Sequence, residues 1–516
     1  MEAIEELLRS AGVDGRRLRT ALALLADGGW WTLADLVRET ATSRRAVEAL
    51  LRAADLERSG DRFRLREPLP GLAAVPAAPA DPVAHLLGGH AGLLARMEEL
   101  VAAAPRGRQA LDHVAATAET VVRRALLMDT RFWLPGARLL FVGDHDLTSL
   151  ATALLRPDAE VAVVDLDERV LAYIAEQADR LGVSVRTRWA DLRLGLPASV
   201  RDWADLAFTD PPYTPEGIGL FAARAVEGLG DRERGRVLLA YGAGEHTPAL
   251  ALKVQHALGA LNLVSEAIYP DFNRYHGAEA IGSAADLYVL RPTTKTWPAV
   301  AARVDGLGAA IYTHGPQSVE SRPAGVVPDP LPADFAPGVL VGEWPRDVLP
   351  KTPRARLSTW LAKPYAAEAA EVAIAVPAGM EAVLPRLLLA TRARRVRAWT
   401  AAPADPPAGP LTAVYEVTAR GRSVEAVRRP LPEGQRERVL RGILDNAHGK
   451  LANTWREALI RARGDLTKRQ ARALVAQAAP WAGDATVLEL PAHRLAELPA
   501  AVAASLATPA AAGSPG

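Results

Sequence analysis

Arg138-Leu-Leu-Phe-Val142 and Glu160-Val-Ala-Val-Val164 are two short apolar runs, and each is followed at once by a turn residue, Gly143 and Asp165. Similar runs follow at 183–187, 204–208, 236–240, 261–264 and 286–290, with helical stretches between them. Strands that alternate with helices predict a parallel sheet with helices on both faces. The segment therefore predicts an α/β domain of the doubly wound, Rossmann-like class.

The carboxyl ends of these predicted strands carry Gly143, Asp165, Asp191 and Asp210. In open α/β sheets, ligands bind beyond the carboxyl ends of the strands. A glycine and three acids at this edge predict a binding site for a ligand that carries hydroxyl or cationic groups.

The composition bounds the class of protein. The chain has 516 residues, of which 49% are hydrophobic and 23% charged, and its net charge is +1. This length predicts about two to four domains, and the near-neutral charge gives no global argument for nucleic-acid binding. The absence of cysteine excludes disulfides, zinc–thiolate sites and cysteine nucleophiles. No leader-like or membrane-spanning run is evident, so we expect a cytoplasmic protein without a membrane partner.

Residues 1–68 predict a winged-helix-like domain. Apolar stripes around 18–25, 33–37 and 47–54 predict three helices, and 56–65 predicts a small hairpin. Such a domain either binds DNA through its third helix or serves as an interaction domain. Acids interspersed with the arginines of the third helix favour the interaction role.

The remaining boundaries follow from composition. We expect linker and connecting helices at 69–110, the Rossmann-like domain at 111–297, and a connecting segment with a Pro-rich linker at 298–338. An accessory α+β domain is expected at 339–500, with strands near 371–376, 396–400, 413–417 and 423–427. Two helices are expected around 437–463 and 467–478, the first carrying Asn446, His448, Lys450 and Trp455. Residues 501–516 predict a flexible tail.

The turn after the first strand is acidic. In S-adenosylmethionine-dependent methyltransferases this turn is rich in small residues, whereas here Gly143 is followed by Asp144, His145 and Asp146. Carboxylates at this position repel the methionine carboxylate by about 1–4 kcal/mol per close contact, and they attract an ammonium group. The turn therefore favours decarboxylated S-adenosylmethionine, or a polyamine. Helix capping alone requires one carboxylate.

Three further acids are candidates for holding the adenosine part of the donor. Asp165 follows the second strand, where nucleotide-binding folds often have an acid that accepts the ribose hydroxyls, and Asp167 lies two residues further on. Asp191 is a candidate for the adenine amino group. Helix capping is the structural alternative for Asp165.

Asp210-Pro211-Pro212-Tyr213 follows the fourth strand. The two prolines predict a rigid turn that projects the acid and the aromatic ring at the edge of the sheet. Motifs of this type hold an amine nucleophile in amino-group methyltransferases. We expect Asp210 to hold the attacking nitrogen, with Pro211, Pro212 and Tyr213 around the substrate.

The predicted reaction is attack of an amine on the methylene group next to a sulfonium. A protonated amine is not a nucleophile, so a carboxylate must accept its proton. We expect Asp146 or Asp144 to act as this base, and Glu216 and the sheet-edge acids to bind the distal ammonium groups. No metal is expected.

The chain resembles the branched-chain polyamine synthases, also called N(4)-bis(aminopropyl)spermidine synthases. The resemblance is best from about Leu111 to Thr296. It rests on the segments Ala118–Met128, Gly143–Ser149, Val163–Glu168, Asp210–Thr214 and Phe272–Gly282. The resemblance implies transfer of aminopropyl groups from decarboxylated S-adenosylmethionine to the secondary amine of spermidine, with release of methylthioadenosine. The acidic turn of that family is Gly-Asp-Asp-Asp, from which His145 departs, so His145 bears on the choice of acceptor.

Two other functions fit parts of the sequence. One is an S-adenosylmethionine-dependent N-methyltransferase, which suits Asp210–Tyr213 but not the acidic turn. The other is a winged-helix regulator that binds DNA and senses a polyamine. The resemblance does not cover the region after about Gly338, for which substrate access, homodimerisation or partner binding are the candidate roles.

Overall fold

The computed structural model describes residues 2–12, 15–67, 81–244, 247–304, 310–321, 331–403 and 409–509. Residues 69–80 of the predicted linker and connecting helices at 69–110, and residues 322–330 of the predicted Pro-rich linker, lie outside these ranges. The chain divides into two compact units. Unit 1 comprises Met1–Val161, Ala178–Val185 and Ala204–Gly306, and unit 2 comprises Ala162–Gln177, Arg186–Trp203 and Leu307–Gly516.

The N-terminal part of unit 1 contains four helices and a small sheet. The helices are α1 (Glu2–Ser10), α2 (Gly15–Leu25), α3 (Leu33–Thr40) and α4 (Arg44–Ala53). Strands β1 (Trp31–Thr32), β2 (Leu56–Ser59) and β3 (Arg62–Leu65) form an antiparallel sheet in the order β1-β3-β2. The predicted hairpin and the three predicted helices are present, and α1 precedes them. The winged-helix interpretation stays a prediction.

This part packs on the rest of unit 1, and the backbones of the two parts come close together at Ala41 and Gly282. Both α3 and α4 contact the single-turn helix Glu279–Ile281. Gly282, with φ of +80°, lies so near that a Cβ there would be 2.6 Å from the carbonyl oxygen of Ala41. A glycine is therefore required both by the backbone conformation and by the lack of space.

A seven-stranded sheet has the strand order β6-β5-β4-β7-β8-β10-β9. Its strands are β4 (Arg138–Val142), β5 (Glu160–Asp165), β6 (Val185–Trp189), β7 (Leu206–Thr209), β8 (Arg236–Tyr241), β9 (Leu263–Arg274) and β10 (Ala284–Pro292). β4, β7 and β8 are parallel, as predicted, and β4 is almost fully buried. The sheet and the alternation of strands and helices establish the Rossmann-like fold.

Strand β10 differs from the predicted parallel arrangement. β10 runs antiparallel to β8 and to β9. The connection from β9 to β10 spans only residues 275–283. A parallel neighbour requires a crossover of a dozen or more residues, usually with a helix, so this short connection makes a hairpin instead.

The helices of this region form two groups in unit 1. The helices α9 (Pro215–Gly228), α10 (Pro248–Ala260) and α11 (Thr296–Val304) pack together, with α9 against β4, β7 and β8. The helices α5 (Ala91–Ala103), α6 (Ala118–Arg131) and α7 (Thr148–Leu155) form the other group. Helix α8 (Glu168–Leu181) follows β5, and most of it belongs to unit 2.

Unit 2 contains a second, six-stranded sheet in the order β12-β11-β13-β14-β16-β15. Its strands are β11 (Val339–Val341), β12 (Arg354–Ala355), β13 (Glu371–Val376), β14 (Arg395–Thr400), β15 (Tyr415–Arg420) and β16 (Ser423–Arg428). Four of them, β11 to β14, pair in parallel with one another, whereas β16 pairs antiparallel with both β14 and β15. The short helices α12 (Leu357–Ala362) and α13 (Leu384–Leu389) lie between strands in the sequence.

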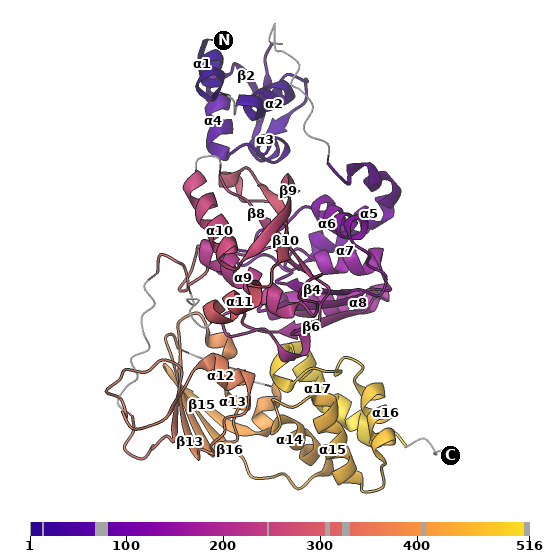
Figure 1. The fold of residues 1–516 in the computed structure, drawn as a ribbon, viewed down its shortest axis with the longest axis vertical. Helices are drawn as coiled ribbons and strands as arrows, with labels where there is room; N and C mark the ends of the chain where they lie inside the picture. Colours follow the sequence, from indigo (N-terminus) through magenta and orange to yellow (C-terminus); the bar gives the residue numbers. More distant parts are fainter. Residues whose placement is uncertain are drawn as a thin grey trace. The chain divides into compact units, whose positions relative to one another are not determined.

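Four helices complete unit 2 and pack on one another: α14 (Gln435–Leu444), α15 (Leu451–Arg463), α16 (Lys468–Ala478) and α17 (Ala492–Ala507) (Figure 1). The helix predicted around 437–463 is thus interrupted between Leu444 and Leu451. Asn446, His448 and Lys450 lie in this interruption, where Gly449 disfavours a continuous helix. The tail predicted from residue 501 is wrong up to Ala507, because α17 buries Val502 and Ser505.

Candidate active site

The turn after β4 combines a glycine requirement with a helix cap. Gly143 has φ of +71°, and a Cβ there would lie 3.2 Å from Cε1 of Phe221. The two carboxylate oxygens of Asp144 accept hydrogen bonds from the backbone N–H groups of Thr148 (2.9 Å) and Ser149 (3.1 Å). Asp144 therefore caps α7, which is the structural role that competes with the predicted catalytic one.

Asp146 points in another direction and is 7% exposed. Its Oδ1 accepts a hydrogen bond from the backbone N–H of Ala116 at 2.8 Å. Its Oδ2 accepts one from Nη1 of Arg124 at 2.9 Å. Asp146 is consequently the acid of this turn that joins a buried ion pair.

Arg124 lies at the centre of the cluster, on α6, and is fully buried. Its guanidinium donates to Asn273 Oδ1 (2.8 Å), Asp146 Oδ2 (2.9 Å), Thr148 Oγ1 (3.3 Å), Asp210 Oδ2 (2.5 Å) and Tyr275 OH (3.1 Å). Such a planar fork holds two carboxylates in fixed positions. Arg124 thus joins α6, the turn after β4, the turn after β7 and the end of β9.

In the predicted motif Asp210–Tyr213, the carboxyl group of Asp210 lies next to the hydroxyl of Tyr213. Tyr275 OH donates to Asp210 Oδ2 at 2.8 Å, and Tyr213 OH lies 3.2 Å from Asp210 Oδ1. The two hydroxyls are 2.8 Å apart. Pro211 and Pro212 are buried, and Thr214 caps α9 by accepting from the N–H of Gly217. The rigid turn predicted from the two prolines therefore holds Asp210 against two tyrosines.

The two paired acids have opposite pKa shifts. Burial opposes ionisation of Asp146, but the charge of Arg124 and the hydrogen bond from Ala116 outweigh it and hold the pKa of Asp146 below its usual value. Burial raises the pKa of Asp210 to about 6; Arg124 lowers it and the nearby charge of Asp146 raises it. Asp210 is therefore the carboxyl of the pair that exchanges a proton near neutral pH.

His145 stacks on His113, with ring centroids 4.3 Å apart and planes inclined by 16°. Its Nδ1 is buried and has no hydrogen-bond partner among the described residues. In place of a third acid, the turn thus contributes an imidazole ring that stacks on a second imidazole, that of His113.

The candidate adenosine-binding acids belong to unit 2, and each has a local partner. Asp165 Oδ1 accepts a hydrogen bond from the N–H of Asp167 at 2.7 Å. Arg169 binds both carboxylate oxygens of Asp167, and Arg193 binds both of Asp191, at 2.6–3.0 Å and 2.7–3.1 Å. Their predicted roles in cofactor binding stay predictions.

The structure brings together Asp146, Asp210 and Tyr213 of the predicted site residues. Glu216 is exposed in the first turn of α9 and makes none of the hydrogen bonds of this cluster. Sequence reasoning assigned no role to Arg124, Asn273 or Tyr275. An arginine within the apolar run of α6 was the available signal, because a buried arginine requires acidic partners.

The described residues include neither a metal-binding cluster nor a membrane-spanning helix. No group of three or more His, Asp or Glu side chains in these ranges is arranged to hold a metal ion. No helix that the structure describes is long and apolar enough to cross a membrane.

The central segment is similar to known proteins. Residues 92–309 match the family model of the branched-chain polyamine synthase A C-terminal domain. The uncharacterized protein MJ0675 of Methanocaldococcus jannaschii is 42% identical over 174 residues, which are 34% of this chain and 43% of the relative. The N(4)-bis(aminopropyl)spermidine synthase of Thermococcus kodakarensis is 35% identical over 138 residues, which are 27% of this chain and 39% of the relative.

A solved structure is also similar to this chain. The branched-chain polyamine synthase of Thermus thermophilus, in complex with N4-aminopropylspermidine and 5′-methylthioadenosine, is 22% identical with a TM-score of 0.41. The match covers 56% of this chain and 91% of that chain. The chain spans less than half the length of the curated relatives that it matches. The resemblance found in the motifs is confirmed: residues 92–309 match the model of the branched-chain polyamine synthase A C-terminal domain.

Proposed function

We propose that the chain transfers aminopropyl groups from decarboxylated S-adenosylmethionine to an amine of a polyamine such as spermidine. The observation that carries the proposal is the buried cluster in which Asp146 and Asp210 share Arg124. Two carboxylates share one guanidinium, so the ionised cluster carries a net negative charge and favours a cationic ligand. Relatives named N(4)-bis(aminopropyl)spermidine synthase support the same reaction.

The proposed reaction is a displacement at carbon. The acceptor nitrogen attacks the methylene group next to the sulfonium, an N–C bond forms, and the C–S bond breaks to release 5′-methylthioadenosine. The nitrogen must first lose its proton. A second transfer to the same nitrogen gives the quaternary amine.

We assign the proton acceptor to Asp210, which revises the expectation that Asp146 or Asp144 is the base. A pKa near 6 suits a group that is ionised at neutral pH and that accepts a proton reversibly. Asp146 is tied to Arg124 and to the Ala116 N–H, so its carboxylate orients the guanidinium. Asp144 is tied to the start of α7. Tyr213 and Tyr275 hold Asp210 in position.

The test is an assay of the purified full chain with decarboxylated S-adenosylmethionine and a panel of amines that includes spermidine. Methylthioadenosine and product masses are followed, and intact S-adenosylmethionine is run in parallel. We expect a mass gain of one or two aminopropyl units. D210N should lower kcat about 100-fold or more, whereas D231N, at an exposed turn, should leave it unchanged.

Two outcomes contradict the proposal. Turnover with intact S-adenosylmethionine alone assigns the chain to the N-methyltransferases, which the Asp-Pro-Pro-Tyr motif also fits. No turnover with either donor, but binding of polyamine, favours the sensing regulator.

For residues 1–68 we propose a winged-helix-like domain that docks on its own chain. Arg44, at the start of α4, forms an ion pair with Glu279 at 2.6 Å, and Arg17 forms one with Asp271 at 2.9 Å. These intramolecular pairs support an interaction role. The Arg44 pair engages the first residue of α4, the helix that a DNA-binding domain of this type inserts in the groove, and the Arg17 pair holds α2. Anisotropy of labelled duplex DNA tests this. Tight binding that weakens steeply with salt contradicts it.

A further inference from the structure

Unit 2 joins the C-terminal region to two pieces of the seven-stranded sheet. Residues 162–177 contain most of β5 and the first turns of α8, and residues 186–203 contain most of β6 and the loop that follows it. Asp165, Asp167 and Asp191 lie on these two pieces. The part of the chain to which the family match does not extend, beyond residue 309, therefore packs with the candidate nucleoside-binding acids.

Arg386 makes the central contact. It lies on α13 and is 4% exposed. Its guanidinium carbon is 3.5 Å from the ring centroid of Trp189, the last residue of β6. Its Nη2 donates to Glu168 Oε1 at 2.6 Å and to the carbonyl oxygen of Leu490 at 2.9 Å. One side chain thus contacts the end of β6 and the first residue of α8, which follows β5.

The contact is supported from both sides. Trp189 Nε1 donates to the carbonyl oxygen of Leu166 at 3.1 Å, so the ends of β5 and β6 are also linked directly. The other carboxylate oxygen of Glu168 accepts from the N–H of Ala492, the first residue of α17, at 2.7 Å. Arg386 and Glu168 are therefore held in a defined geometry.

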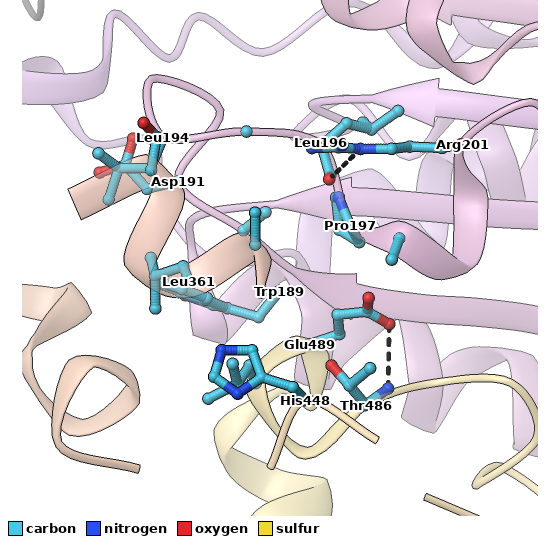
Figure 2. Close-up of a pocket in the computed structure, with 16 residues that line it drawn as sticks. Trp189, Asp191, Leu194, Leu196, Pro197, Arg201, Leu361, His448, Thr486 and Glu489 are labelled. Carbon is cyan, nitrogen blue, oxygen red and sulfur yellow. Dashed lines mark hydrogen bonds between the residues drawn. The ribbon is translucent and has the colours of Figure 1, made fainter. Parts of the chain in front are cut away.

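The loop after β6 has further contacts with the C-terminal region. Arg193, which binds Asp191, donates through Nη2 to the carbonyl oxygen of Gly379 at 3.0 Å. The N–H of Ser199 donates to Glu489 Oε1 at 3.3 Å. Figure 2 shows Asp191, Leu194 and Leu196 of the loop around a cavity whose other side is formed by Leu361, His448 and Glu489. The cavity holds about 110 Å³, whereas ligand pockets have about 300–1,000 Å³, so we interpret it as a packing gap.

We propose that Arg386 is a positioning residue for the nucleoside part of the sulfonium donor. It fixes the separation of the two strand ends that carry Asp165 and Asp191, and the C-terminal region thereby sets the affinity for the donor. The stack on Trp189 and the ion pair with Glu168 act on residues within three positions of these acids. A ligand held by both strand ends binds more weakly when their spacing is free to vary. The inference rests on the proposed function for the identity of the donor.

The test measures binding of 5′-methylthioadenosine by calorimetry, together with KM for decarboxylated S-adenosylmethionine. We expect R386M to weaken binding about tenfold and E168Q about threefold, with less than additive effects in the double variant. KM should rise in parallel, while kcat changes less than about twofold. E168Q changes a partly exposed carboxylate, so it carries the test if R386M does not fold.

The matched control is R441M. Arg441 is equally buried in unit 2 and pairs with Asp445 at 2.9 Å, but its described hydrogen bonds all lie within the C-terminal region. Unchanged binding by folded R386M and E168Q overturns the inference, and so does an equal loss in R441M. Failure of the proposed function has a different result: the wild-type chain binds the nucleoside and transfers no aminopropyl group.

Discussion

Replacing Tyr275 with phenylalanine removes a hydroxyl that donates to Asp210 Oδ2 at 2.8 Å. The hydrogen bond stabilises the ionised carboxyl and lowers its pKa, against burial, which raises the pKa to about 6. A hydrogen bond to a charged group contributes about 1.5 kcal/mol, and one pKa unit corresponds to about 1.4 kcal/mol. Y275F should therefore raise the pKa of Asp210 to about 7. At pH 6 the ionised fraction falls from about one half to about one tenth, so activity should fall about fivefold.

The assay is kcat/KM for the polyamine between pH 5 and 9, whose acidic limb reports the free-enzyme pKa of the base. Y241F is the matched control, because Tyr241 is 1% exposed and its hydroxyl has no hydrogen-bond partner among the described residues. We expect the acidic limb to move up by about one unit in Y275F and to stay in Y241F. An unmoved limb in Y275F, or equal shifts in both variants, refutes Asp210 as the base.

Three further predictions concern stability, each measured by scanning calorimetry. R124M leaves two buried carboxyls without their cation, so Tm should fall by about 10 °C at pH 7.5. In R124M the pKa values of Asp146 and Asp210 are then higher in the folded protein than in the unfolded one. The free energy of unfolding therefore decreases as the pH rises from the unfolded to the folded pKa values. The loss should therefore be smaller at pH 5, and a pH-independent loss contradicts the pairing. G282A should cost clearly more than G28A: both glycines have positive φ, but only Gly282 has a backbone carbonyl within 2.6 Å of the added Cβ. D144A should cost about 1 kcal/mol by removing the cap of α7, and serine should restore most of it; equal losses in both variants argue against capping.

The local sequence was sufficient for the strands and for part of the site. Short apolar runs with polar turns predicted β4, β5, β7 and β8, because buried parallel strands need continuous apolar side chains. The common edge of such strands then predicted that Asp146, Asp210 and Tyr213 lie together. These predictions depend only on the spacing of apolar and turn residues within a few positions, which can be read directly from the sequence.

The other features depend on contacts between distant segments. Arg124 contacts Asn273 and Tyr275, which lie 149 and 151 positions further along the chain. No periodic pattern in the sequence links residues that are so far apart. The sequence alone left open whether Asp144 or Asp146 is the helix cap, because only the direction of each side chain distinguishes them. The antiparallel β10 was missed because its apolar pattern equals that of a parallel strand.

The composition of unit 2 has a consequence for the order in which the chain folds during synthesis. Glu168 accepts hydrogen bonds from Arg386 and Ala492, which lie 218 and 324 positions later in the chain. Ser199 donates one to Glu489, which lies 290 positions later. At about 5–20 residues per second, a ribosome needs roughly 10–40 s after Trp189 emerges to supply Arg386. During this interval β6 and the start of α8 lack the partners that bury them. Such a nascent chain is expected to depend on chaperones until α17 is complete.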